Sequence, residues 1–341
     1  MYHKRIVVDF DDTLAFHQNR QFDKALPNTD LIEKLNGLYD QGWQIDIFTA
    51  RGSISCKTRE EARQKYEEGM KSWLEKHGVK YHALSFDKPL AAYYIDDKGI
   101  MPEDFLEVNI RELEGGLSGT EIYTDGKVVH KQDPNAHATR EWFTTTQSTE
   151  IKTPIIHRVV GDTITMDYVE HDENYFVENF HKALGIVQSN LEIMKTIDNE
   201  SVFTFEAYRS RIRDHAANSN QKLLMDVAVR LNTMFLQPSF AHGDFGIKNM
   251  LFKDGDMYLI DPICNVFGCT ALDAAKFCAS LIINKYPTNL IEKSIDYISV
   301  MNDINRFELI TLISSEITRV YKYHPDKNFI MECVKYVYEQ G

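Results

Sequence analysis

Short apolar runs alternate with helical patterns over the first third of the chain. Residues 6–8 are an apolar run, residues 44–48 are expected to form a second strand, and residues 28–39 place leucines at helical spacing. A second helix begins near Thr58, where Glu61 completes a capping-box pattern. A third strand is expected at residues 93–95. This order of strand, helix, strand, helix and strand predicts a parallel sheet covered by helices.

The pattern changes after Phe105. A glycine-rich stretch precedes a hairpin pattern whose turn lies at Asp125 and Gly126. Two further strands are expected at residues 155–160 and 163–169. The sheet pattern ends there, so residues 111–170 form a small sheet lobe.

The rest of the chain is mostly helical from Tyr175 onward. Short strands at residues 250–252 and 257–260 interrupt the helical pattern. A length of 341 residues is enough for two packed cores. We therefore predict two domains, residues 1–110 and 111–341, and a helical lobe over residues 171–341.

Charge and cysteine content narrow the class of protein. The formal net charge of −13 argues against broad contact with nucleic acid or an anionic membrane, since both require a basic surface. The five cysteines form no CxxC pair, which favours reduced, structural thiols. No apolar stretch is long enough to span a membrane, and the N-terminus leads directly into a strand. A cytoplasmic protein is expected.

Polar residues follow each strand of the first predicted sheet. Asp9 and Asp11 come after the first strand, Thr49 after the second, and Asp96 and Asp97 after the third. Ligands of parallel sheets bind at the carboxyl ends of the strands, where these residues would converge. Several carboxylates at one place require a divalent cation, and Mg²⁺ prefers oxygen ligands. An aspartate in this position suits attack on phosphorus.

The strings DFDDT, IFTARG, DKP and IDD occur in this order and resemble the motifs of the haloacid dehalogenase superfamily of phosphatases. The resemblance implies an α/β domain of Rossmann-like type, in which Asp9 is the nucleophile and Asp11 the general acid and base. Thr49 would bind the transferring phosphoryl group, and Lys88 would offset its charge. Mg²⁺ would be held by four aspartates: Asp9, Asp11, Asp96 and Asp97.

The connections between these motifs are too short for a cap domain, so the phosphatase site should be open. The segments PNTDLIEKLNGLYDQGWQIDIFTARG and KPLAAYYIDDKGIMPEDF are similar to capless phosphatases encoded with bacterial capsule biosynthesis. That similarity implies a sugar phosphate or a related precursor of a surface polysaccharide as substrate.

A second string, HGDFGIKN, lies in the helical lobe. Asp244 stands five residues before Asn249, and Asp261 follows an apolar strand twelve residues further on. An aspartate five residues before an asparagine suits activation of a hydroxyl for phosphoryl transfer. His242 is expected to shape the loop by hydrogen bonding.

Residues 112–341 resemble the aminoglycoside phosphotransferase and choline kinase group, relatives of protein kinases with a bilobal α+β fold. The resemblance implies that Asp244 accepts the proton of the substrate hydroxyl, and that Asn249 and Asp261 hold Mg²⁺. Asp273 would support the catalytic loop, and Glu141 would pair with Lys131. The residues implied at the nucleotide, ATP or GTP, are Gly116, Ser118, Gly119, Lys131, Glu141, Met166 and Tyr168.

Together the two motif sets indicate a bifunctional phosphatase and kinase of small metabolites, such as sugars, polyols or amino alcohols. Two alternatives stay open. One is a nucleic-acid end-processing enzyme, although the chain lacks a GxxxxGK[ST] loop. In the other, one domain is active and its companion is a regulatory or binding module.

Overall fold

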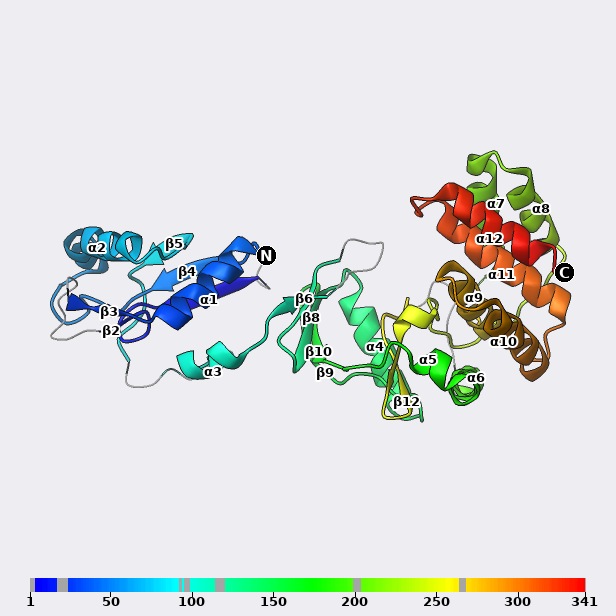
Figure 1. Ribbon diagram of the computed structural model, residues 1–341, viewed down its shortest axis with the longest axis horizontal. Helices are drawn as coiled ribbons and strands as arrows, with labels where there is room; N and C mark the ends of the chain where they lie inside the picture. Colours follow the sequence, from blue (N-terminus) through cyan, green and yellow to red (C-terminus); the bar gives the residue numbers. More distant parts are fainter. Residues whose placement is uncertain are drawn as a thin grey trace. The chain divides into compact units, whose positions relative to one another are not determined.

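The chain divides into two compact units, Met1–Ile110 and Arg111–Gly341 (Figure 1). The computed structural model describes residues 4–16, 24–91, 94, 99–113, 120–198, 204–263 and 268–340. Within these ranges, none of the helices combines the length and the apolar character needed to cross a bilayer.

The first unit contains a parallel three-stranded sheet in the order β1-β4-β5. The strands are β1 (Arg5–Asp9), β4 (Gln44–Phe48) and β5 (Ala83–Ser85). Asp9 pairs with Phe48 in register, and the amide of Thr49 donates to the carbonyl of Ser85 at 2.9 Å. The three strands therefore end at the same edge, which brings the residues that follow them together.

The predicted strands at residues 6–8 and 44–48 are confirmed. The sequence did not indicate β5, which has only three residues and no clear alternation. The strand expected at residues 93–95 has both of its ends outside the described residues. The unit also has a short antiparallel pair, β2 (Ala15–Phe16) and β3 (Leu26–Pro27).

Three helices accompany this sheet: α1 (Thr29–Asp40), α2 (Arg59–Lys76) and α3 (Pro102–Glu107). The side chain of Thr58 caps α2 by accepting the amide of Glu61 at 3.1 Å. The Glu61 carboxylate reaches back to the amide of Lys57 at 2.8 Å, one residue before the position of an ideal capping box. Phe10 packs edge-on against Trp73 of α2 with ring centroids 5.2 Å apart, which fixes the backbone beside Asp9 and Asp11.

The second unit begins with an antiparallel five-stranded sheet in the order β6-β7-β8-β10-β9. Its strands are β6 (Arg111–Glu112), β7 (Ile122–Thr124), β8 (Val128–Gln132), β9 (Ile156–Val160) and β10 (Thr163–Asp167). The expected turn holds Gly126 at φ +90°, the left-handed region that favours glycine. Helix α4 (Ala136–Thr146) follows β8 and buries Trp142 and Phe143.

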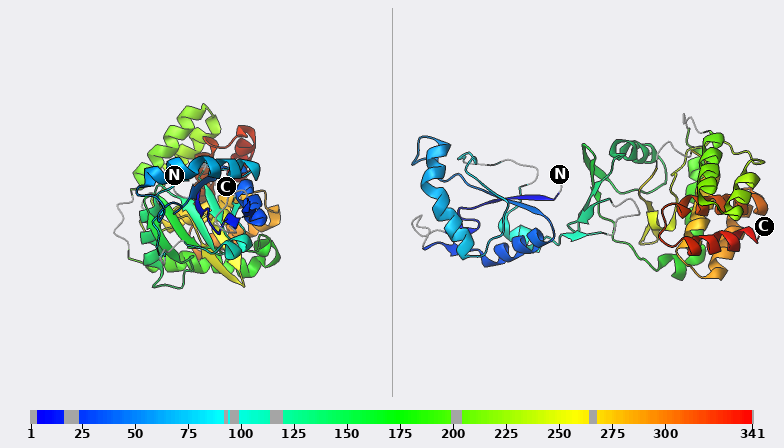
Figure 2. Two further views of the ribbon diagram at one scale, coloured as in Figure 1. Left: turned by 90° about the vertical axis from the view of Figure 1, so that its left-hand side faces the viewer. Right: turned by 90° about the horizontal axis from the view of Figure 1, so that it is seen from above.

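The remainder of this unit is helical, as predicted, apart from one hairpin of β11 (Met250–Lys253) and β12 (Asp256–Leu259). The helices pack together on one side of the sheet lobe (Figure 2). They are α5 (Tyr175–Glu178), α6 (Phe180–Thr196), α7 (Phe205–Ser219), α8 (Lys222–Leu231), α9 (Thr270–Ile283), α10 (Thr288–Met301), α11 (Arg306–Tyr321) and α12 (Lys327–Tyr338).

Helices α9 and α11 form the centre of the helical lobe and are buried along most of their length. Their apolar residues belong to one continuous core. Polar residues that face inward must find partners, because an unpaired buried polar group is costly. On α11 Glu316 is fully buried, pairs with Arg319 at 2.6 Å and accepts the hydroxyl of Tyr208 at 2.7 Å. On α9 the inward polar residues Asp273 and Ser280 bond to the HGDFGIKN segment.

Candidate active sites

Asp9 and Lys88 form an ion pair at the carboxyl edge of the first sheet. The Lys88 ammonium lies 2.7 Å from a carboxylate oxygen of Asp9, and the other oxygen accepts the amide of Phe10 at 3.0 Å. Burial raises the pKa of Asp9, while Lys88 acts in the opposite direction. The arrangement presents one carboxylate oxygen beside a cation, as attack on a phosphate would require.

Asp11 is held by two residues that follow β4. The Thr49 hydroxyl donates to one oxygen of Asp11 at 2.7 Å, and the Arg51 Nε donates to the other at 2.9 Å. A second guanidinium nitrogen of Arg51 also bonds to that oxygen. Thr49 in turn accepts the amide of Arg51 at 2.9 Å. The second aspartate of DFDDT is thus fixed by a charged and a neutral donor.

The structure therefore brings Asp9, Asp11, Thr49 and Lys88 to one edge of the sheet. Arg51 belongs to this group, and sequence reasoning missed it although it stands two residues after Thr49 in IFTARG. Asp96 and Asp97 lie outside the described residues. Over the part of the chain that is described, no three His, Cys, Asp or Glu side chains converge as a metal site. Asp9 and Asp11 supply oxygen donors that fit Mg²⁺.

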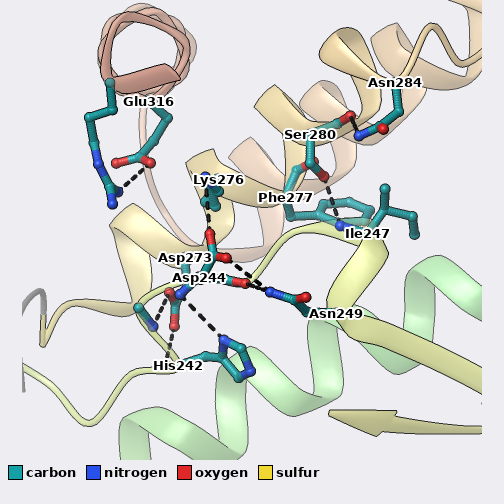
Figure 3. A network of polar contacts seen from close by, with 12 residues as sticks. His242, Asp244, Ile247, Asn249, Asp273, Lys276, Phe277, Ser280, Asn284 and Glu316 are labelled. Atoms are coloured by element: carbon teal, nitrogen blue, oxygen red, sulfur yellow. Dashed lines mark hydrogen bonds and ion pairs between the residues drawn. The ribbon is translucent and has the colours of Figure 1, made fainter. Parts of the chain in front are cut away.

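The HGDFGIKN loop of the second unit leads into a short 3-10 turn, Ile247–Asn249, and then into β11. The side-chain amide of Asn249 donates to the Asp244 carbonyl at 2.8 Å and to its carboxylate at 3.0 Å. The loop thereby folds back on itself and fixes the Asp244 side chain (Figure 3). Because the amide nitrogen makes these bonds, the amide oxygen of Asn249 is oriented to accept a cation.

One face of α9 supports this loop through three side chains, Asp273, Lys276 and Ser280, which follow helical spacing (Figure 3). The Asp273 carboxylate accepts the amides of His242 at 2.6 Å and Gly243 at 2.9 Å. Ser280 accepts the amide of Ile247 at 2.9 Å. Burial raises the pKa of Asp273 to about 8, against the two amides, which lower it.

Lys276 completes this face by bonding to the carboxylate of Asp244. Its ammonium nitrogen lies 3.0 Å from an oxygen of Asp244, and the two side chains are 18% and 31% exposed. Burial raises the pKa of Asp244, but Lys276, with smaller contributions from His242 and Arg319, brings it below its usual value. Sequence reasoning did not identify Lys276. Its position three residues after Asp273 on a helix was the available signal.

His242 has a structural position, as the sequence indicated. Its Nε2 lies 2.8 Å from the Ile260 carbonyl, and its Nδ1 accepts the amide of Asp244 at 3.3 Å. Burial lowers the pKa of His242 to about 4, so the ring is neutral near neutral pH. The Trp142 indole donates to the Ala241 carbonyl at 3.0 Å and joins α4 to the same loop.

Lys131 of β8 reaches Asp261 at 2.5 Å and Asp133 at 3.8 Å. The expected pairing with Glu141 is wrong, because Glu141 is exposed on α4. The buried face of that helix is formed by Ala136, Thr139, Trp142, Phe143 and Thr146. Asp133 takes the position beside Lys131 because it lies three residues before α4 and accepts the hydroxyl of Thr139 at 2.9 Å.

Two of the remaining residues predicted to bind the nucleotide, Met166 and Tyr168, lie in the described part of the chain. Met166 is buried in β10, and Tyr168 lies just beyond that strand, where its ring is 5.2 Å from the Arg111 guanidinium. The amide of Tyr168 donates to the Lys127 carbonyl at 2.8 Å. Gly116, Ser118 and Gly119 lie outside the described residues. Lys131, Asp244, Asn249 and Asp261 thus carry the described part of the candidate kinase site.

No model of a protein family matches the chain, and neither does any curated protein. Similar solved structures include a thermostable mutant of the aminoglycoside phosphotransferase APH(4)-Ia in a ternary complex with AMP-PNP and hygromycin B. It is 12% identical, covers 70% of this chain and 96% of its own, and has a TM-score of 0.52. A choline/ethanolamine kinase family protein from Mesorhizobium loti is 11% identical over 68% of this chain and 86% of its own, with a TM-score of 0.49.

A protein from Vibrio cholerae is 29% identical over 31% of this chain and 89% of its own, with a TM-score of 0.26. The phosphotransferase likeness shows the fold: a mixed α/β, kinase-like fold covers about two thirds of the chain. The second unit, residues 111–341, occupies a similar share.

Proposed function

We propose that the second unit transfers the terminal phosphoryl group of ATP or GTP to a hydroxyl of a small molecule. The geometry of Asp244 carries this proposal: its carboxylate is held by Asn249 and Lys276 in a loop that α9 fixes from behind. Asp244 would accept the hydrogen bond of the substrate hydroxyl and then its proton as the oxygen attacks phosphorus. A lowered pKa keeps this carboxylate ionised and ready to accept.

The other kinase residues supply charge and orientation. Lys131 would exchange its contact with Asp261 for one with the nucleotide phosphates, which leaves Asp261 and the Asn249 amide oxygen to hold Mg²⁺. When bound, Mg²⁺ neutralises the phosphate charge. A kinase-like fold over two thirds of the chain supports the same assignment.

An Asp244→Asn variant tests the kinase. Wild-type protein, ATP and Mg²⁺ are incubated with a panel of sugars, polyols and amino alcohols, and ADP is followed separately from free phosphate. We expect Asp244→Asn to lower acceptor-dependent ADP formation by about a hundredfold or more, since a positioned base contributes about 10²–10⁴-fold. Asp256→Asn, a half-exposed change on β12, is the matched control. Equal activity of the Asp244 variant and wild type would contradict the kinase role of Asp244.

We further propose that the first unit is a Mg²⁺-dependent phosphatase. An Asp9 oxygen would attack phosphorus, the ester P–O bond would break, and Asp11 would give its proton to the leaving oxygen. Water would then attack the aspartyl phosphate, with Asp11 taking its proton, which releases phosphate and restores Asp9. The contacts of Asp9 with Lys88, and of Asp11 with Thr49 and Arg51, support these roles.

The phosphatase is tested with p-nitrophenyl phosphate and with the sugar and polyol phosphates of the same panel. Asp9→Asn removes the nucleophile and should reduce phosphate release to background, while kinase activity stays. Asp12→Asn is the matched control, because Asp12 is an exposed neighbour with φ 57°, which asparagine also adopts. Phosphate release that survives in Asp9→Asn would rule out an aspartyl phosphate on that residue.

The two activities must act on different positions or different molecules. If both used one phosphoryl position, the protein would only hydrolyse nucleotide. We therefore propose successive modification of a sugar, polyol or related precursor of a bacterial capsule or surface polysaccharide. The panel described above also tests this proposal, because one compound serving as kinase product and phosphatase substrate at the same carbon would contradict it.

A further inference from the structure

Lys276 stands at an unusual place for a lysine of a buried helix. Helix α9 is almost entirely buried, yet Lys276 extends from it into the catalytic loop and ends at Asp244 (Figure 3). Its neighbours on the same face, Asp273 and Ser280, bind backbone amides of the loop. Lys276 alone of the three bonds to the carboxylate that would meet the substrate.

The ammonium lies on one side of Asp244 and the Asn249 amide on the other. Lys276 donates to Oδ1 at 3.0 Å, whereas Asn249 donates to Oδ2 at 3.0 Å. Asn249 already fixes the carboxylate and the loop backbone, so orientation of Asp244 does not require a second, charged donor. A lysine ammonium carries three N–H donors, and its bond to Asp244 uses one of them.

The position of Asp244 determines what else the ammonium can reach. An acceptor hydroxyl that donates to Asp244 must lie about 3 Å from that carboxylate and about 3–3.5 Å from the phosphorus it attacks. The Lys276 nitrogen is 3.0 Å from the same carboxylate. The ammonium and the acceptor hydroxyl would thus contact one carboxylate, which puts the flexible lysine within reach of the space through which the phosphoryl group would pass. Negative charge spreads there over the equatorial oxygens in the transition state.

Packing around the lysine stem keeps the ammonium in this region. A Cβ at Gly246 would lie 3.9 Å from the Cε of Lys276 and 3.4 Å from the Cβ of Ser280, so the loop packs directly on the stem. The Lys276 side chain is 18% exposed, so it is not sealed inside the helical core. Lys293, in contrast, is exposed on α10, outside this loop.

We propose that Lys276 is a catalytic residue of the kinase site that contacts the terminal phosphoryl group of the bound nucleotide. The proposal rests on the kinase function proposed above. The lysine would bond to a terminal phosphate oxygen while its contact with Asp244 keeps acceptor and donor aligned. Lys276 would approach the nucleotide from the helical lobe, whereas Lys131, which contacts Asp261, would approach it from β8 of the sheet lobe.

The test compares two nucleotides that differ by the terminal group, AMP-PNP and ADP, each with Mg²⁺. Their dissociation constants are measured by titration calorimetry for the full chain, for Lys276→Met and for Lys293→Met as matched control. We expect Lys276→Met to weaken AMP-PNP binding by about tenfold, to leave ADP binding within about twofold, and to lower kcat. Lys293→Met should bind both nucleotides as the wild type does.

Lys276→Gln separates contact from positioning, because glutamine keeps a donor for Asp244 without the charge. We expect it to lose AMP-PNP affinity as Lys276→Met does, with ADP affinity retained as proof of an intact site. AMP-PNP affinity at the wild-type level in both variants, or rescue by glutamine, would overturn the proposal. Absence of nucleotide binding by the wild type would instead refute the kinase function itself.

Discussion

At the scale of single residues, the HGDFGIKN loop is held by side chains with defined hydrogen-bond partners. His242 uses one ring nitrogen toward the Ile260 carbonyl and the other toward the Asp244 amide. This pattern fixes the neutral tautomer with the proton on Nε2. A charged ring would place a second N–H against an amide N–H. The neutral His242 ring therefore links the HGDFGIKN loop to Ile260, the residue that directly follows β12.

The stability of the loop should consequently depend on pH through His242. Its pKa falls from 6.5 to about 4 on folding, so the unfolded chain binds the proton more readily between these values. The stabilisation is complete above pH 6.5 and is lost as pH falls toward 4. The loss amounts to roughly 3 kcal/mol over the whole of this range and to roughly 2 kcal/mol between about pH 7.5 and about pH 5 by linkage. Urea unfolding at about pH 7.5 and about pH 5, followed by circular dichroism, measures it.

The control for this prediction is His242→Gln, which keeps a donor for Ile260 but does not titrate. Its free energy of unfolding should change less between the two pH values than that of the wild type. Parallel pH dependence in the two proteins would show that His242 does not carry the effect.

Gly243 is required by the backbone of the loop. Its φ of +79° lies in the left-handed region, and a Cβ there would stand 2.5 Å from the Ile263 carbonyl oxygen. We expect Gly243→Ala to shift Asp244 and to lower kcat by about a hundredfold, as misplacement of a catalytic group by about 1 Å can. Gly246→Ala is the control, since its Cβ would meet Ser280 at an ordinary 3.4 Å. Steady-state kinetics on both variants checks this, and equal kcat values would contradict it.

At the scale of elements, α9 acts as the support of the catalytic loop. Three side chains on one face hold residues 242–247: Asp273 accepts two backbone amides, Ser280 accepts one, and Lys276 forms an ion pair with Asp244. The opposite faces of α9 are buried in the helical core, next to α11. Helix α9 therefore fixes the loop, and with it the candidate catalytic residue Asp244, relative to the helical core.

If α9 holds the loop in this way, replacing two buried serines by alanine should lower the free energy of unfolding by unequal amounts. Ser280→Ala leaves the buried amide of Ile247 without its acceptor and should cost roughly 1–3 kcal/mol in the free energy of unfolding. Ser294→Ala on α10 removes a bond only to Leu290, within its own helix, and should cost about 0.5 kcal/mol or less. Denaturant unfolding of both variants provides the measurement. Similar losses would mean that α9 does not hold the loop through Ser280.

The sequence predicted elements well where the pattern was long and capped, as at Thr58 before α2. It missed β5 because three residues carry no measurable alternation. It identified Asp244 and Asn249 because local spacing determines their contact, but missed Lys276, whose partner lies 32 residues away through tertiary packing. The partner of Lys131 was predicted wrongly for the same reason: tertiary packing decides which face of α4 is buried, and Glu141 is not on that face.

At the scale of the whole molecule, each candidate site consists of residues from one unit. Asp9, Asp11, Thr49, Arg51 and Lys88 belong to the first unit, and Lys131, Asp244, Asn249, Asp261 and Lys276 to the second. Each unit also has its own buried apolar residues, among them Phe10 and Ile47 in the first and Phe277 and Leu312 in the second. Neither proposed chemistry borrows a described residue from the other unit.

Because each candidate site consists of residues from one unit, we expect both proposed activities to survive when the two units are produced separately. Residues 111–341, produced alone, should bind Mg²⁺-ADP with the dissociation constant of the full chain to within about threefold, because all the described residues of the candidate kinase site belong to this unit. Residues 1–110 should release phosphate from p-nitrophenyl phosphate at the rate of the full chain. Circular dichroism first establishes that each piece is folded, and Asp244→Asn and Asp9→Asn in the matching pieces give the backgrounds. A folded piece that has lost more than about tenfold in binding or rate would show that its site depends on the other unit. The two units would then depend on each other in function, in addition to being linked in one chain.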